Sequence, residues 1–109
     1  MKFLKKALGR KAVKSPKFDF KGTTADQAKF LATAVVLEDT GVSAYAGQGT
    51  RIKSPAVVKA ALSIHSVEAR HAAHFRTLAG KGFAPRSFDK AASMKSVLKA
   101  VGKTGFIKK

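Results

Sequence analysis

Residues 63–75 read SIHSVEARHAAHF, and the position of Glu68 in this stretch decides the interpretation of the fold. The surrounding sequence, from about Pro55 to Ala79, is predicted to form one long helix that stops at Gly80. On a helix that turns about 100° per residue, six apolar residues fall within roughly 40° of Glu68: Val57, Ala61, Ile64, Ala72, Phe75 and Ala79. Glu68 therefore lies in the middle of the apolar stripe.

The second of the two glutamates, Glu38, has the same setting. A helical pattern runs from about Ala25 to Ala46, and its apolar members lie within roughly 60° of Glu38: Leu31, Ala34, Val35, Val42 and Tyr45. Burying an ionised carboxylate without a partner costs several kcal/mol. Arg70 and Arg76 lie off the stripe, so we interpret a bound cation as the compensating charge.

A histidine strengthens the metal interpretation. His71 follows Glu68 by three residues, so the two side chains share a helix face, about 5–6 Å apart. Carboxylate with imidazole, without thiolate, favours iron or manganese. We therefore predict Glu38, Glu68 and His71 as metal ligands. His65 is either an alternative ligand or a core histidine, and Tyr45 either a core residue or a redox residue beside the ligands.

The fold predicted from these patterns is all-α. The short segment from Gly47 to Ser54 favours an antiparallel return between the two long helices, with Thr24 and Gln27 as a capping box before the first. Short amphipathic helices are expected at KFLKKALG, stopped by Gly9, and around residues 94–101, ending before Gly102. No segment alternates like a strand. We divide the chain into a basic helical stub and connector (1–22), a helical hairpin (23–80) and a basic tail with a short amphipathic helix (81–109).

The composition is strongly basic, with 22 Lys+Arg against 6 Asp+Glu, a net charge of +16 and a pI near 10.7. Sixteen of the 22 basic residues lie in residues 1–22 and 80–109, which suggests attraction to polyanions. No base-reading motif or aromatic platform is evident, so sequence-specific recognition is not expected. The absence of cysteine excludes disulfides and zinc–thiolate sites. With no apolar run for a membrane span and no secretory signal, we expect a cytoplasmic protein.

Three segments carry a family resemblance: FLATAVVLEDTGVSAYAGQ (30–48), IKSPAVVKAALSIHSVEARHAAHFR (52–76) and SFDKAASMKSVLKAV (87–101). They resemble the third and fourth helices, and the segment after them, of ferritin-like domain proteins related to the plant desiccation-associated protein. In such bundles one Glu from each of two helices and a Glu-x-x-His from each of the other two hold two metal ions. The resemblance implies Glu38 as the single Glu, and Glu68 with His71 as the Glu-x-x-His.

The resemblance also implies that a partner completes the site. Residues 1–20 resemble the end of the family's second helix and its crossover, so the chain supplies half of the ligand set. A homodimer would bring together two copies each of Glu38, Glu68 and His71, as encapsulated ferritins do in building their site across a dimer interface. A separate partner supplying the first helix pair is the alternative.

Three interpretations of the chain follow from these observations. The first is a di-iron protein, with manganese as the alternative metal, that oxidises Fe(II) with O₂ or a peroxide. The second is a non-enzymatic basic stress- or desiccation-related protein that binds nucleic acid or an anionic surface. The third is a truncated remnant of a full-length ferritin-like protein. The sequence does not choose between an enzyme and a binding protein.

Overall fold

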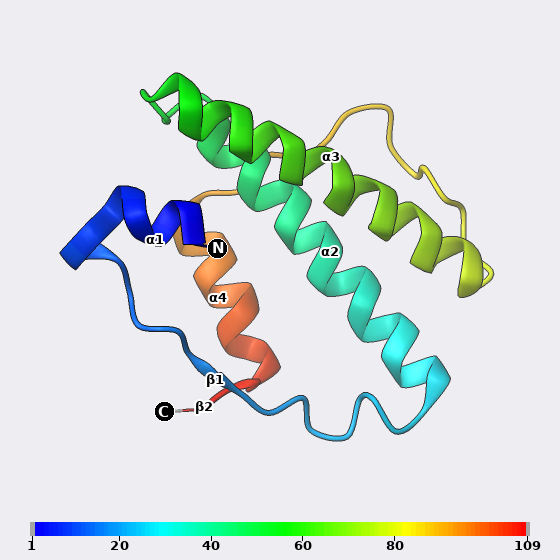
Figure 1. Cartoon of the computed structure of the whole chain (residues 1–109). Coiled ribbons are helices and arrows are strands. Elements are labelled where there is room, and N and C mark those ends of the chain that lie inside the picture. Colours follow the sequence, from blue (N-terminus) through cyan, green and yellow to red (C-terminus); the bar gives the residue numbers. More distant parts are fainter. Residues whose placement is uncertain (1, 109) are drawn as a thin grey trace.

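The computed structural model describes residues 2–108, and its centre is an antiparallel pair of long helices (Figure 1). Helix α2 spans Gln27–Gly49 and helix α3 spans Pro55–Leu78. The two helices pack along their length, with Leu31, Val35 and Val42 of α2 and Ala72 of α3 buried. The predicted all-α fold, with a long helical hairpin as its core, is confirmed.

The N-terminus of α2 differs from the prediction. The side chain of Asp26, and not that of Thr24, caps the helix, because Asp26 Oδ1 accepts a hydrogen bond of 2.8 Å from the backbone N–H of Lys29. Asp and Thr are both good capping residues, so the sequence pattern alone placed the start two residues too early. Helix α3 begins at Pro55 after Ser54, as predicted.

Helix α2 also continues through Gly47 to Gly49, three residues beyond the predicted end. Gly47 serves packing there, since a Cβ on this residue would overlap the backbone carbonyl of Ala92. The backbone N–H of Ala92 donates a 2.9 Å hydrogen bond to the carbonyl of Ser43, one turn earlier on α2. A glycine in the last turns of α2 therefore lets the segment that precedes the last helix approach closely.

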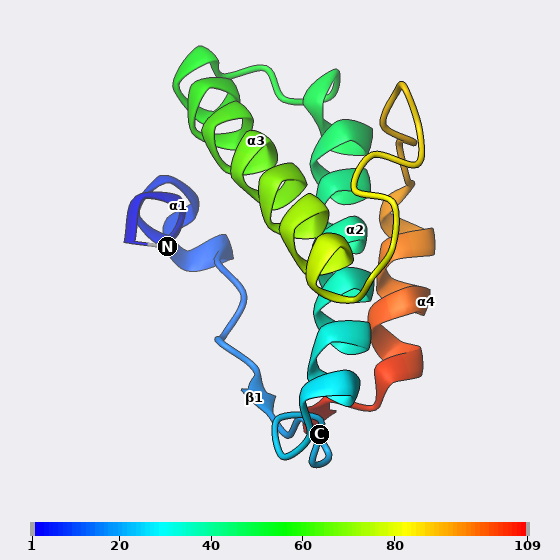
Figure 2. The same ribbon diagram turned by 90° about the vertical axis from the view of Figure 1, so that its right-hand side faces the viewer.

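The two short helices flank the hairpin. Helix α1 spans Lys2–Leu8 and is followed by a 3₁₀ turn, η1, at Gly9–Lys11. Helix α4 spans Met94–Thr104 and packs against α2. The predicted stop before Gly102 is wrong: the helix passes through Gly102 and ends at Gly105, which adopts the left-handed conformation at φ 65°. Figure 2 shows α1 and α4 on opposite sides of the hairpin.

A two-stranded antiparallel ribbon joins distant parts of the chain. Strand β1 (Lys17–Phe18) pairs with strand β2 (Ile107–Lys108), and the N–H of Asp19 donates a 2.7 Å hydrogen bond to the carbonyl of Phe106. The Phe20 ring packs edge-to-face on Phe106 at 5.4 Å, and Phe106 is buried. These strands could not be predicted from the sequence, because two residues are too few to show an alternating pattern.

The buried core of the described chain is small. Besides the four residues of the hairpin, only Phe106 among residues 2–108 is a buried apolar side chain. Leu4 of α1 borders an apolar pocket of about 240 Å³ against Tyr45 and Ile64. Large apolar side chains stay exposed on all four helices, including Phe3, Phe30, Leu78 and Leu98. Within residues 2–108, each helix is too short or too polar to cross a membrane.

Candidate metal centre

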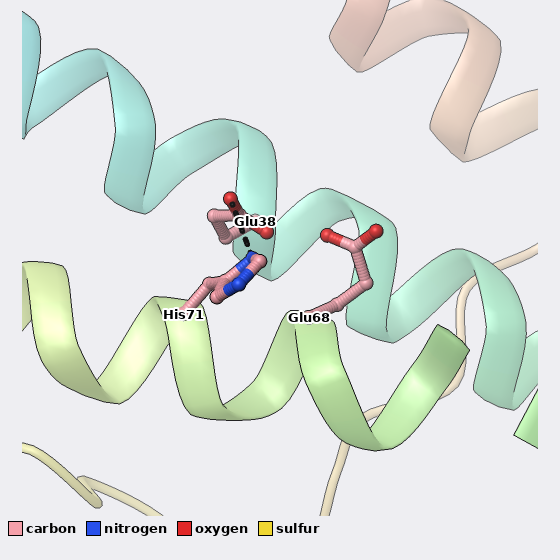
Figure 3. A group of neighbouring side chains, drawn as sticks. All are labelled: Glu38, Glu68 and His71. Carbon is pink, nitrogen blue, oxygen red and sulfur yellow. Dashed lines mark ion pairs between the residues drawn. The ribbon is translucent and has the colours of Figure 1, made fainter. Parts of the chain in front are cut away.

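The three predicted ligands come together where α2 and α3 face each other (Figure 3). Glu38 extends from α2, and Glu68 and His71 extend from successive turns of α3. Each side chain offers one oxygen or nitrogen atom, and these atoms all lie within 4.8 Å of one another. The Nδ1 atom of His71 is 3.4 Å from Oε1 of Glu38. The helical spacing that suggested the group therefore leads to a real cluster.

Within the cluster, Glu38 is more buried than His71. The Glu38 side chain is 19% exposed, whereas His71 is 55% exposed and forms the outer edge of the cluster. Oε2 of Glu38 is buried and has no hydrogen-bond partner in the described part of the chain. An unpartnered buried carboxylate oxygen is costly, so it marks a place where a cation would be stabilising.

The electrostatics of Glu38 agree with this burial. Loss of solvent raises the pKa of the Glu38 carboxyl to about 7, and the neighbouring Glu68 carboxyl acts in the same direction. Two carboxylates this close resist ionising together. A divalent cation between them would relieve that repulsion and hold both in the charged form.

The separations of the ligand atoms are compatible with one metal ion. Metal–ligand bonds of about 2.0–2.2 Å allow two ligand atoms of one ion to lie up to about 4.4 Å apart. Oε1 of Glu38 and Nδ1 of His71 are 3.4 Å apart, and all three ligand atoms lie within 4.8 Å of one another. The donor set of two carboxylates and one imidazole suits iron or manganese.

Gly41 makes room for Glu68. It lies on α2 one turn after Glu38, and a Cβ at this position would come within 3.3 Å of Oε2 of Glu68 and 3.5 Å of its carboxyl carbon. A glycine in the middle of a helix costs about 1 kcal/mol relative to alanine, so close packing is the expected reason for it. The structure refines that view, since the group that approaches Gly41 is the Glu68 carboxylate.

The two residues predicted to support the ligands have different settings. Tyr45 is close enough to Glu68 that the carboxylate charge, after the larger effect of burial, raises the pKa of the Tyr45 phenol. His65 lies outside the cluster, with its Nε2 atom 3.4 Å from Oδ2 of Asp89 in the segment after α3. This nitrogen is buried and makes no hydrogen bond within the described chain, and the sequence could not reveal its position beside Asp89.

A second charged pair ties the two long helices together away from the cluster. The guanidinium of Arg76 donates a hydrogen bond to the carboxylate of Asp39, and the Arg76 side chain is only 16% exposed. The Asp39 side chain is 43% exposed, so the acidic member of this pair lies nearer to solvent than Arg76. Because Arg76 is engaged there, it does not neutralise Glu38 or Glu68.

Comparison with known proteins identifies a family for the helical hairpin. A family model described as the ferritin-like domain matches residues 1–81, which include α1, α2, α3 and all three predicted ligands. The match does not extend to residues 87–101, where a resemblance was also expected. No curated protein matches the chain. The match covers most of the sequence, and the chain belongs to the ferritin-like domain family.

Proposed function

We propose that this chain is a ferritin-like iron-binding protein in which Glu38, Glu68 and His71 are the metal ligands. The observation that carries the proposal is the buried, unpartnered Oε2 of Glu38 beside a second carboxylate and an imidazole. In the described chain, no cation of the protein is paired with Glu68, and His71 alone is paired with Glu38. Membership of the ferritin-like family supports the same assignment.

Each ligand has a distinct role in the proposal. Glu38 and Glu68 would supply the negative charge that holds the metal, and His71 would supply a nitrogen ligand from the solvent side. Tyr45 lies near Glu68, whose charge, after the larger effect of burial, raises the pKa of the Tyr45 phenol. Iron bound by such ligands supplies one-electron redox chemistry, in which Fe(II) is oxidised and O₂ or a peroxide is reduced. Manganese is the alternative metal.

We further propose that a second copy of the chain completes the site. One chain offers two carboxylates and one imidazole, half of the four carboxylates and two imidazoles of a dinuclear bundle site. His71 is 55% exposed, so the cluster is accessible to another hairpin. Exposed Phe30 and Leu78 give the hairpin apolar surface to bury. Two-fold dimers are the most common closed assembly.

The charge distribution is compatible with such pairing. Two chains of charge +16 repel each other, but only six of the 22 basic residues lie between residues 23 and 79. Four of the six acidic residues lie in the same range, so the hairpin itself is nearly neutral. The repulsion between cationic flanks is screened over about 8–10 Å at physiological salt. Contact between two hairpins therefore keeps most of the positive charges, which lie in the flanks, out of the interface.

Metal binding is tested by equilibrium dialysis against Fe(II) without oxygen and against Mn(II), followed by elemental analysis. The expected result is about one ion per chain, lost in Glu38→Gln and in Glu68→Gln. Asp19→Asn is the matched control, because it also removes one carboxylate but lies outside the cluster, beside Lys21 and Lys108. Equal retention in all variants would contradict the proposal. Admitting O₂ to the iron-loaded protein then tests oxidation through the near-ultraviolet absorbance of carboxylate-bound Fe(III).

The dimer is tested separately by light scattering with size-exclusion chromatography, with and without metal. If the mass of two chains persists in Glu68→Gln, apolar contact holds the dimer together. If the mass of two chains is found only when metal is added, shared metal ligands hold it together. A single-chain mass at all concentrations and metal loads would refute the second copy. In that case metal bound by the monomer would still support the ligand assignment.

A further inference from the structure

The connector between α3 and α4 forms a pocket against the hairpin. It leaves α3 at Gly80 and crosses beside α2 and α3 before α4 begins, as Figure 2 shows. The pocket has a volume of about 380 Å³, within the range of roughly 300–1,000 Å³ typical of small-molecule sites. Its floor is made of small side chains from α3, namely Ala69, Ala72 and Ala73. The pocket is separate from the metal ligands, none of which lines it.

Two aromatic rings border this pocket in exposed positions. Phe83 is 67% exposed and Phe88 is 88% exposed, although both belong to the most apolar class of side chain. Among residues 2–108, neither ring stacks on another aromatic ring. Exposed rings that serve no packing role offer flat apolar faces to a ligand.

The same segment carries unpaired positive charge. Arg86 and Lys90 line the pocket, and neither takes part in an ion pair within the described chain. Of the two acids at the pocket, Asp39 is paired with Arg76, and Asp89 lies 3.4 Å from Nε2 of His65, so the three basic side chains Arg76, Arg86 and Lys90 outnumber the acids. The pocket therefore presents a net positive charge beside two free aromatic faces.

We propose that this pocket binds single-stranded nucleic acid, with bases stacking on Phe83 and Phe88 and phosphates contacting Arg86 and Lys90. Base–aromatic stacking and a cationic backbone groove are the two elements of sequence-independent single-strand binding. The net charge of +16 favours a polyanion over an isolated nucleotide, because each further phosphate contact adds affinity. The pairing of Phe83 with Phe88 could not be predicted from the sequence, because the two residues are five positions apart in an irregular segment.

The shape of the site separates a nucleic-acid strand from two rival polyanions. A peripheral membrane site is usually the apolar face of an amphipathic helix, whereas Phe83 and Phe88 lie in an irregular segment and border a pocket. A DNA duplex keeps its bases stacked inside the helix, so its bases cannot reach the rings. A flexible single strand can turn a base into the hollow while its phosphates follow the cationic rim.

A tryptophan probe tests the stacking directly. The chain contains no tryptophan, so Phe88→Trp places a single fluorophore at the pocket. Titration with an oligothymidylate is expected to quench its emission, because a stacked base contacts the indole ring. Heparin, which has comparable charge but no bases, is expected to bind without that quenching. The same quenching by heparin would overturn the proposal.

The double variant Phe83→Ala/Phe88→Ala tests the energetics. We expect its affinity for the labelled oligothymidylate, measured by fluorescence anisotropy, to fall by at least about tenfold while affinity for heparin is unchanged. Both rings are exposed, so their removal leaves the fold intact, which far-ultraviolet circular dichroism checks. Unchanged oligonucleotide affinity in a folded double variant would refute the assignment.

A matched pair of charge variants separates the pocket from general basicity. Arg86→Gln/Lys90→Gln and Lys95→Gln/Lys99→Gln both remove two positive charges, but the second pair lies on α4 outside the pocket. The pocket pair is expected to weaken oligonucleotide binding more and to reduce its salt dependence by about two phosphate contacts. Equal effects of the two pairs would contradict a site. Stronger binding to anionic vesicles, to duplex DNA or to a mononucleotide than to the single strand would overturn the assigned ligand.

Discussion

The carboxylate of Glu68 on α3 lies against the backbone of Gly41 on α2, so close that any Cβ on Gly41 would press on it at 3.3 Å. A glycine in the middle of a helix costs about 1 kcal/mol relative to alanine. The helix accepts that cost at the one position where a side chain would displace a predicted ligand. The relationship links a local loss of helix stability to the geometry of the carboxylate cluster.

The first prediction concerns Gly41→Ala. Helix propensity favours the variant by up to about 1 kcal/mol, so its free energy of unfolding is expected to be equal to or higher than that of the native chain. The displaced Glu68 carboxylate is expected to weaken Mn(II) affinity about tenfold. Gly49→Ala is the control, because a Cβ there meets nothing within 4 Å. Native metal affinity in Gly41→Ala would contradict a role for this close approach.

The second prediction concerns Gly47→Ala. A Cβ at this position would overlap the carbonyl of Ala92, which is backbone and has little freedom to move aside. We expect a loss of about 1–3 kcal/mol in the free energy of unfolding, as for other overpacked sites. The amide of Ala92, which donates to the Ser43 carbonyl, should also exchange faster with solvent. Urea denaturation and hydrogen exchange, each compared with Gly49→Ala, measure these effects.

The third prediction distinguishes two residues as the cap of α2. Asp26→Ala should cost about 1 kcal/mol of stability, because it removes the acceptor for the Lys29 amide. Thr24→Ala should have almost no effect, since Thr24 lies outside the helix in an exposed turn. Thermal unfolding of both variants gives the comparison. A larger loss from Thr24→Ala would restore the cap position that the sequence pattern suggested.

The fourth prediction is a pH dependence of the metal-free protein. Folding raises the pKa of Glu38 from 4.5 to about 7, so between these values the folded state holds a proton that the unfolded state has lost. Stability then falls as pH rises through this window and levels off above it, because the folded state binds more protons. Glu38→Gln should remove this fall and be relatively more stable above pH 7. Urea titrations at several pH values, with metal excluded, measure the slope.

Much of the hairpin could be predicted from the sequence, because its apolar residues recur with the period of an α-helix. The start of α3 at Pro55 and the inward direction of Glu38 and Glu68 both follow from spacing along one helix. The approach of Glu68 to His71 is set by a three-residue offset on the same helix. Only the meeting of Glu38 with this pair needed a second assumption, namely that the two helices pack antiparallel.

The parts that sequence analysis missed all depend on irregular segments. The Asp89 carboxylate reaches His65 from a connector without helical or strand periodicity, so no angle could be assigned to it. Gly47 was interpreted as a helix end because its partner, Ala92, is distant in sequence. Phe83 and Phe88 gave no pattern because their exposure depends on the path of that same connector.

The short ribbon of β1 and β2 has a mechanical consequence. Because Phe18 is fastened to Ile107, the segment leading back to α1 is anchored at the far end of α4. Helix α1, whose Leu4 borders the apolar pocket, can therefore move only as far as the segment between α1 and β1 allows. Separation of β2 from β1 would remove this restraint on α1, so the C-terminal strand limits the movement of the N-terminal helix.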